Sequence, residues 1–249
     1  MFAYRLDETS ELRLLEERHA PELTELTDRN REHLRAWLPW LDDNRTLEDR
    51  KNFIRATLRQ LANNDGFQAG IWHQDRLGGV IGYHGIDWKN RGTSLGYWLG
   101  AEFTGKGLMT VSCRALTAHA FEAYGLKRVN IVCATENERS RAIPERLGFE
   151  LEGVRRQAEW LYDRFVDHAL YGMLADDWRN RRRRVIPTVP PLVVNGPTNG
   201  ARPAALPCGL WPRRGPPRPA RGTGCRGAPT PRSSLALAPL GRRACGRRP

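Results

Sequence analysis

The chain has 249 residues, with 40 Lys and Arg against 28 Asp and Glu, and a formal net charge of +12. Residues 181–249 hold 15 arginines and no Asp, Glu or Lys, so the first 180 residues carry a formal net charge of −3, because 15 exceeds 12 by three. No stretch approaches the ~18 apolar residues of a membrane helix, and the N-terminus lacks an apolar signal region. We therefore expect a cytoplasmic protein without a membrane partner.

The composition changes sharply near residue 180. Residues 181–249 hold 14 of the 17 prolines and little apolar material, which predicts a disordered Arg/Pro/Gly-rich tail after a folded domain over residues 1–178. One interpretation makes this tail a tether for the ribosome or RNA, because clustered arginines release counterions from phosphates. The other makes it a non-native extension with no selected role. The lack of interleaved aromatic residues favours the second interpretation.

Residue types that bind metals are scattered along the chain. The folded part contains only Cys113 and Cys133, and the six histidines share no ligand-like spacing, so neither a metal site nor a disulfide framework is predicted. The two cysteines fall in a predicted helix and a predicted strand without a paired histidine. We expect both in the core rather than acting as acyl-carrying nucleophiles.

The first third of the folded part predicts one strand and two helical segments. Residues 11–17 alternate as a strand does. Pro21 suits the first turn of a helix, and Pro39 ends the helical pattern that follows. Thr46 and Asp49 form a capping box, with Asp in place of the usual Glu or Gln, before a second amphipathic helix.

The middle of the chain predicts an antiparallel meander and then a helix. Residues 67–73, 79–86 and 93–100 read as three strands joined by polar turns. Residues 107–124 are helical, and Gly125 follows at the position where a left-handed cap is favoured.

The last part predicts three more strands and one short helix. Residues 128–135 form a strand, Asn137 caps the short helix that follows, and Gly148 ends it. Residues 150–156 and 165–174 are extended. The whole order predicts an α+β fold with a mixed, mostly antiparallel central sheet flanked by helices.

Two glycines precede the central helix in a way that predicts an anion site. Gly105 and Gly107 flank Lys106, so free backbone N–H groups at the helix N-terminus are available to a phosphate. Residues 100–106 also match G-x-x-x-x-G-K of nucleotide hydrolases. Those enzymes need Ser or Thr at the position of Gly107 to hold magnesium, and the next strand lacks a metal-binding Asp, so the hydrolase interpretation is weak.

The same residues resemble a motif of the GCN5-related N-acetyltransferase (GNAT) family. Residues 102–107 are similar to its Q/R-x-x-G-x-G/A motif, although Glu102 departs from the first position and its side chain is expected to point away from the anion. Residues 137–149 resemble the family's N-x-x-S-x-x-x-x-E-K-L-G-F segment. Residues 95–99 and 157–160 further resemble the branch that acetylates N-terminal serine or alanine of ribosomal proteins.

The resemblance implies an acyl-CoA N-acyltransferase fold and direct transfer from acetyl-CoA in a ternary complex, without a metal. It assigns Glu159 as general base and Ser140 as hydrogen-bond donor to the coenzyme A sulfur, with a backbone N–H near Leu99, freed by a bulge, polarising the acetyl carbonyl. Surface roles for Glu159 in a turn and Ser140 on a helix stay open. The residues implied in binding the coenzyme are Trp98, Leu99, Gly105, Lys106, Gly107, Leu108, Met109, Thr110 and Asn137.

The acceptor is left open among three functions. The leading one acetylates a protein N-terminus, the second a small amine or antibiotic, and the third is an inactive module that binds coenzyme A or RNA. The third arises because Pro144 lies inside the short helix, which we expect to kink or to end early. The oligomeric state, monomer or homodimer, is also open. By resemblance, six residues border the acceptor groove: Trp37, Leu38, Trp40, Trp88, Trp160 and Tyr162. For Trp37, packing in the core is the favoured interpretation.

Overall fold

The computed structural model describes residues 3–185. A single eight-stranded sheet runs through this part in the order β1-β2-β3-β4-β5-β6-β8-β7. Its strands are β1 Ala3–Arg5, β2 Ser10–Leu14, β3 Gln68–His73, β4 Arg76–Asp87, β5 Gly92–Leu99, β6 Arg128–Ala134, β7 Glu150–Leu161 and β8 Arg164–Leu174. The α-helices are α1 Ala20–Arg29, α2 Arg31–Arg35, α3 Leu47–Ala62, α4 Leu108–Glu122, α5 Glu138–Leu147 and α6 Ala175–Val185, with short 3-10 turns η1 Glu17–His19 and η2 Ala101–Phe103.

The sheet is antiparallel except at its centre. Strands β1 to β5 form successive antiparallel pairs, and β6 pairs antiparallel with β8, which in turn pairs with β7. Only β5 and β6 run parallel, because α4 carries the chain back between them. The predicted α+β class and mostly antiparallel sheet are confirmed; strand β1 and helix α6 were not predicted.

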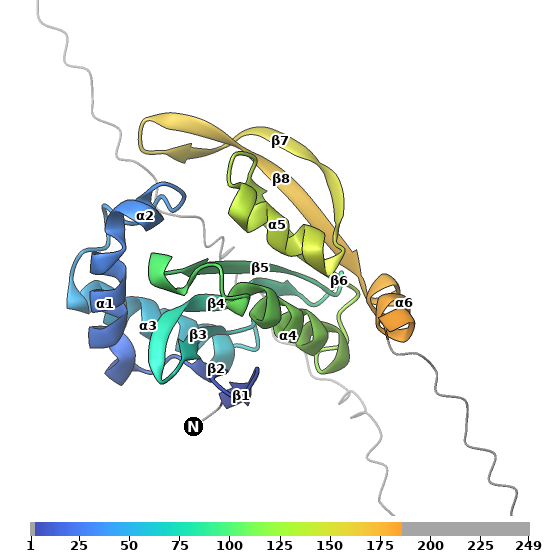
Figure 1. Cartoon of the computed structure of the whole chain (residues 1–249), viewed down its shortest axis with the longest axis horizontal. Helices are drawn as coiled ribbons and strands as arrows, with labels where there is room; N and C mark the ends of the chain where they lie inside the picture. The colour runs from blue at the N-terminus through green and yellow to red at the C-terminus, as the bar shows by residue number, and fades with distance from the viewer. Residues whose placement is uncertain (1–2, 186–249) are drawn as a thin grey trace, which may run out of the picture. The chain divides into compact units, whose positions relative to one another are not determined.

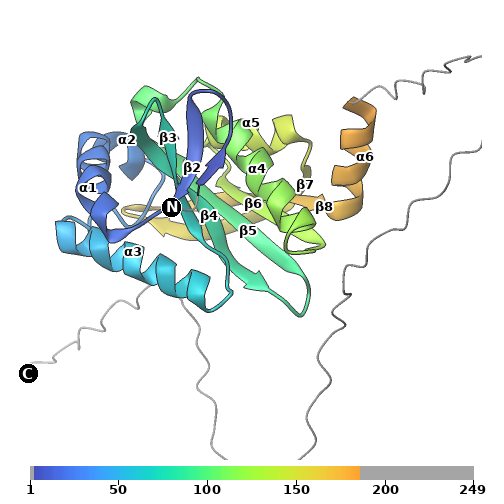
Figure 2. The same ribbon diagram turned by 90° about the horizontal axis from the view of Figure 1, so that it is seen from below.

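Helices cover both faces of the sheet (Figure 1 and Figure 2). Helices α4 and α5 lie on one face, here called the α4 face, over a core that includes Leu95, Ile131 and Tyr171. Helices α1 and α3 pack on the opposite face, the α1 face, where a second core joins them to Trp72 and Val80. Neighbouring side chains of one strand point to opposite faces, so β3 and β4 contribute residues to both cores.

Local signals in the sequence place the ends of the helices. The Oγ1 of Thr46 accepts from the N–H of Asp49 at 3.1 Å, and the Asp49 carboxylate accepts from the N–H of Thr46 at 2.8 Å, so the predicted capping box is present. Gly125 follows α4 with φ of +65° and Gly148 ends α5 with φ of +81°. Both are left-handed conformations that glycine adopts without a steric cost.

Two predicted boundaries differ from the structure. Strand β7 extends to Leu161 rather than ending at residue 156, because residues 159–161 resume pairing with β8 beyond a bulge. Helix α6 runs across the predicted boundary at residues 178–181, and the rest of the predicted tail lies outside the described residues. Across residues 3–185, no helix is long and apolar enough to cross a membrane.

Candidate active site

The centre of the sheet opens between its two parallel strands. Pairing of β5 with β6 stops at Leu95 and Ile131, yet the strands continue to Leu99 and Ala134. Each remains paired on its outer side, β5 with β4 and β6 with β8. The backbone edges that face each other beyond Leu95 therefore have no strand partner in the described part of the chain. We call this opening the β5–β6 cleft.

The predicted bulge near Leu99 is wrong in position. The irregular pairing of β4 with β5 lies between Tyr83 and Ile86, opposite Leu95 and Thr93. The extra residue belongs to β4 and lies at the paired end of β5. Backbone donors near Leu99 are free because β5 and β6 diverge, not because β5 bulges.

The glycine loop leads into α4 with an open helix N-terminus. Gly105 and Gly107 both have φ of +78°, and a Cβ added at either would meet no atom within 4 Å. Gly107 is the N-cap of α4 and no side chain caps the helix there. Val111 donates to the carbonyl of Gly107 at 3.1 Å, so the N–H groups of residues 108–110 precede the first helical hydrogen bond of α4. This arrangement fits a phosphate group, which needs converging N–H donors and no Cβ in the way.

Charged residues around the loop favour an anion there. Arg146 of α5 donates from Nη1 to the Oγ1 of Thr110 at 2.8 Å, which places a guanidinium beside the first turn of α4. Lys106 lies over the ring of Phe103, with its Nζ 5.5 Å from the ring centroid. The position of Arg146 next to Thr110 was not predicted, because it depends on the packing of α5 against α4.

Glu102 is held by residues of α1 and the turn after it. Its Oε1 lies 3.3 Å from the Nη2 of Arg29. Burial disfavours the charged form, but hydrogen bonds from its own backbone N–H and from Asn30, with Arg29 nearby, keep the pKa of Glu102 below its ordinary value. The carboxylate is thus ionised and already paired, which answers how a negative charge is tolerated at this position of the motif.

Ser140 lies in a small polar cluster on the α4 face. The Oδ1 of Asn137 accepts from the N–H of Ser140 at 3.1 Å, so Asn137 caps α5 as predicted. The Ser140 Oγ lies 3.2 Å from the Sγ of Cys133 and 3.4 Å from the Oη of Tyr97. Cys133 and Tyr97 belong to the two strands that diverge, so the cluster lies at the β5–β6 cleft.

Neither cysteine has the environment of a nucleophile. Cys113 and Cys133 are both buried, as predicted. Burial raises the pKa of the Cys133 thiol, against the opposing effect of hydrogen bonds from Ser140 and Tyr97. Burial also raises the pKa of Cys113 well above its ordinary value. Because the thiolate is the reactive form, both groups are held in the unreactive state.

Glu159 lies in a strand, not in the turn that the alternative interpretation required. It pairs with Val166 of β8, directly after a bulge in β7. Its Oε2 lies 3.5 Å from the Nε2 of His168, and the two side chains are 28% and 18% exposed. His168 precedes Ala169, a core residue under the α4 face, so the imidazole points to the α1 face. No sequence signal singled out His168.

The two predicted catalytic residues, each with an unpredicted neighbour, approach the cleft from opposite faces. Ser140 and Tyr97 lie on the α4 face, where the glycine loop opens. Glu159 and His168 lie on the α1 face, and β8 places His168 opposite Ala134, the last residue of β6. A donor bound at the α4 N-terminus and an acceptor on the α1 face would therefore meet between the diverging strands.

The loop between α2 and α3 borders the α1 face of the cleft. The Oη of Tyr162 donates to the carbonyl oxygen of Leu38 at 2.6 Å, which joins this loop to the β7–β8 turn. The ring of Trp40 lies 6.3 Å from that of Trp98, with the buried Arg50 stacked over Trp40 at 5.3 Å. Three of the residues expected at the acceptor groove, Leu38, Trp40 and Tyr162, therefore lie in this loop or against it.

The other three tryptophans expected at the acceptor groove lie in different surroundings. Trp88 was expected at the groove but lies in the β4–β5 turn, at the far end of β5, where its Nε1 donates to the carbonyl of Asn64 at 2.7 Å. Trp160 is 50% exposed and packs edge-on against Phe165. Trp37 is half-buried and does not belong to either hydrophobic core.

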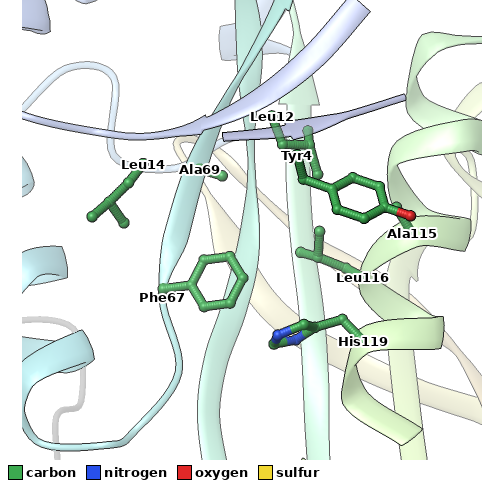
Figure 3. Close-up of a pocket in the computed structure, with 8 residues that line it drawn as sticks. All are labelled: Tyr4, Leu12, Leu14, Phe67, Ala69, Ala115, Leu116 and His119. Atoms are coloured by element: carbon green, nitrogen blue, oxygen red, sulfur yellow. The ribbon is translucent and has the colours of Figure 1, made fainter. Parts of the chain in front are cut away.

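A separate apolar pocket lies between strands β1 to β3 and helix α4 (Figure 3). Phe67 and His119 line it from opposite sides, together with Tyr4, Leu12 and Leu116. Burial lowers the pKa of His119, which keeps the imidazole neutral. None of the predicted site residues lines this pocket.

Known proteins are similar to this chain. A family model described as an acetyltransferase (GNAT) domain matches residues 10–150. YdaF of Bacillus subtilis (strain 168) is 37% identical over 183 residues, which cover 73% of this chain and 100% of the relative.

Two solved structures are similar in sequence and in fold. RimL, a ribosomal L7/L12 α-N-protein acetyltransferase in complex with coenzyme A, superposes with a TM-score of 0.68 at 28% identity, covering 71% of this chain and 99% of RimL. MccE, the microcin C7 self-immunity acetyltransferase in complex with acetyl-CoA and AMP, gives 0.65 at 29% identity, covering 68% and 94%. The chain belongs to the GNAT acetyltransferase family and is an acetyl-CoA-dependent N-acetyltransferase.

Proposed function

We propose that the chain acetylates the α-amino group of a protein N-terminus, and that its natural acceptor is a ribosomal protein. The β5–β6 cleft carries this proposal, because it lies between an anion-binding helix N-terminus on one face and the Glu159–His168 pair on the other. RimL, to which this chain is similar, acts on the N-terminus of a ribosomal protein. We propose the same class of acceptor, the N-terminus of a ribosomal protein, for this chain.

The glycine loop would hold the pyrophosphate of acetyl-CoA. The N–H groups of residues 105–110 are the donors, and Arg146 adds a positive charge beside Thr110. A helix N-terminus stabilises a nearby anion by roughly 0.3–1 kcal/mol per well-placed contact. Asn137 would contact the pantetheine arm, and the backbone near Trp98 and Leu99 would face the acetyl group. Acetyl-CoA supplies an activated acyl group as a thioester.

Glu159 would take the proton from the acceptor amine. A free α-amino group has a pKa of about 7.7–8.0, so near neutral pH a large part must lose a proton before it can attack. The Glu159 carboxylate is a strong enough base to remove this proton, directly or through one water. His168, at 3.5 Å, restricts the orientation of the Glu159 side chain.

Ser140 would stabilise the departing thiolate. Its hydroxyl already lies 3.2 Å from a sulfur, that of Cys133, and the N–H of the same residue is fixed by Asn137. A serine hydroxyl is a weak acid but an adequate hydrogen-bond donor to sulfur. The raised pKa of the Cys133 thiol argues against an acyl-cysteine intermediate and favours direct transfer.

One observation favours a second acceptor class. MccE is a self-immunity acetyltransferase whose structure holds AMP, and its identity to this chain equals that of RimL within one per cent. A small amine therefore stays the second candidate. The third possibility, an inactive module, rested on a disrupted α5, but α5 continues past Pro144 to Leu147.

Release of coenzyme A thiol, measured with a panel of peptides and small amines, separates the two acceptors. The proposal expects turnover with peptides that begin with Ser or Ala and little with free amino acids or aminated antibiotics. Turnover only with small amines would establish the second candidate. A chain shortened to residues 1–185 tests the predicted tail: unchanged peptide turnover and RNA affinity would contradict a tether.

A further inference from the structure

Helix α5 contains a carbonyl group that its own backbone cannot satisfy. In an α-helix the carbonyl of Ser140 would accept from the N–H of residue 144. Pro144 has no N–H, yet α5 continues for three more residues to Leu147. The expectation that the helix ends early is therefore wrong, and the Ser140 carbonyl needs another donor.

Tyr97 supplies that donor from the neighbouring strand. Its Oη donates to the carbonyl oxygen of Ser140 at 3.1 Å. Burial raises the pKa of Tyr97 well above its ordinary value, so the phenol keeps its proton and acts as a donor. Tyr97 lies two residues beyond Leu95, where β5 leaves β6, so this bond ties the first turn of α5 to the wall of the β5–β6 cleft.

The two backbone polar groups of Ser140 are thus both held by side chains. Asn137 accepts from its N–H at 3.1 Å, and Tyr97 donates to its carbonyl. The Tyr97 hydroxyl also lies 3.4 Å from the Ser140 Oγ. Removing the phenol hydroxyl would leave the carbonyl without a partner and free the residue that carries the proposed donor to sulfur.

We propose that Tyr97 is a positioning residue for Ser140 and replaces the helical hydrogen bond that Pro144 abolishes. This inference rests on the proposed role of Ser140. It also explains how a proline is accommodated inside the helix that carries a reacting group.

A set of single and double variants tests the proposal with acetyl-CoA and a peptide that begins with Ser. Tyr97→Phe is expected to lower kcat roughly ten- to a hundredfold, because it displaces the Ser140 hydroxyl. The KM for acetyl-CoA is expected to change little, because the contacts that bind the coenzyme stay in place. Adding Pro144→Ala restores an N–H beneath the Ser140 carbonyl and is expected to recover most of kcat. In a Ser140→Ala background, Tyr97→Phe is expected to have no further effect.

Tyr171→Phe is the matched control. The Tyr171 hydroxyl also bonds to α5, donating to the Oε1 of Glu145 at 2.6 Å and accepting from the Nε of Arg141 at 3.0 Å, but it does not touch Ser140. Its loss is expected to leave kcat within about twofold, and Pro144→Ala is expected to give no recovery. All rates are measured well below the unfolding temperature of each variant, so that added stability alone does not imitate recovery.

Hydrogen exchange provides a readout that needs no turnover. The N–H of Arg141 bonds to the carbonyl of Asn137 at 3.0 Å within the first turn of α5. Tyr97→Phe is expected to speed exchange of this turn, and Pro144→Ala to slow it again. If no acceptor is consumed, the proposed function fails while this comparison still decides the role of Tyr97. The proposal would be overturned if Tyr97→Phe left hydrogen exchange in the first turn of α5 unchanged. It would also be overturned if the losses of kcat in Tyr97→Phe and Ser140→Ala were additive, or if Pro144→Ala did not recover the kcat lost in Tyr97→Phe.

Discussion

The Nε2 of His168 lies 3.5 Å from the Oε2 of Glu159, on the face of the sheet opposite to Ser140. The two residues are nine positions apart and meet because β7 and β8 form an antiparallel hairpin. His168 lies opposite Ala134, the last residue of β6, and the proposed function brings the acceptor amine to this end of the cleft.

Glu159→Gln is expected to lower kcat/KM for a peptide acceptor by about 10²-fold below pH 8, the lower range for loss of a general base. Above that pH the α-amine is already neutral and the loss should shrink. A pH profile from about 6.5 to 9.5 measures this, with Glu152→Gln on the same strand as control. A constant ratio between Glu159→Gln and the unaltered protein across the range would exclude the base role.

Gly107→Ala is expected to weaken coenzyme A binding at least tenfold. A Cβ there would enter the space open to the phosphates, in addition to a backbone strain of about 1–2 kcal/mol. Gly125→Ala carries similar strain, since φ is +65° and nothing lies within 4 Å, but it is at the other end of α4. Calorimetric titration of coenzyme A compares the two. Equal losses would show that the loop does not bind the coenzyme.

Thr46→Ala is expected to lower the free energy of unfolding by about 1 kcal/mol, because it removes an N-cap.

Hydrogen bonding from the Thr46 backbone lowers the pKa of Asp49, its capping-box partner. A carboxyl group with a depressed folded-state pKa stabilises the fold above its unfolded pKa of about 3.9 and loses this effect as the pH falls through the folded value. Denaturant titrations of Asp49→Asn should therefore show a deficit at pH 7 that shrinks near pH 3. A deficit that is constant with pH would contradict an ionised cap.

Tyr162→Phe is expected to raise the KM for the acceptor severalfold without changing the KM for acetyl-CoA. The lost hydrogen bond to the Leu38 carbonyl joins the α2–α3 loop to the β7–β8 turn on the acceptor side only. Initial-rate kinetics with each substrate varied in turn measure this. Tyr124→Phe, at the end of α4 remote from the cleft, serves as control. A change only in the KM for acetyl-CoA would contradict the assignment of the Tyr162–Leu38 hydrogen bond to the acceptor side.

Features that depend on a few consecutive residues were predictable from the sequence. The Thr46 capping box, the Asn137 cap and the left-handed Gly125 and Gly148 form their contacts within one helical turn, so local residue types decide them. The glycine loop belongs to the same class.

Features that depend on strand pairing were not predictable from residue types. His168 reaches Glu159, and Tyr97 reaches Ser140, through pairings between distant segments. Trp88 was misplaced because aromatic character gives no information about which end of a strand faces the site. The number of residues that a bulge inserts into β7 decides the face of Glu159, and no local pattern encodes that number.

The central claim is that the chain places an acetyl group on a protein α-amine. Mass spectrometry of a peptide that begins with Ser and contains an internal Lys, after incubation with acetyl-CoA, tests it most directly. We predict one added acetyl group on the N-terminal residue, and no product from the same peptide with a blocked N-terminus. Acetylation of the Lys side chain, or of small amines in place of any peptide, would contradict the account.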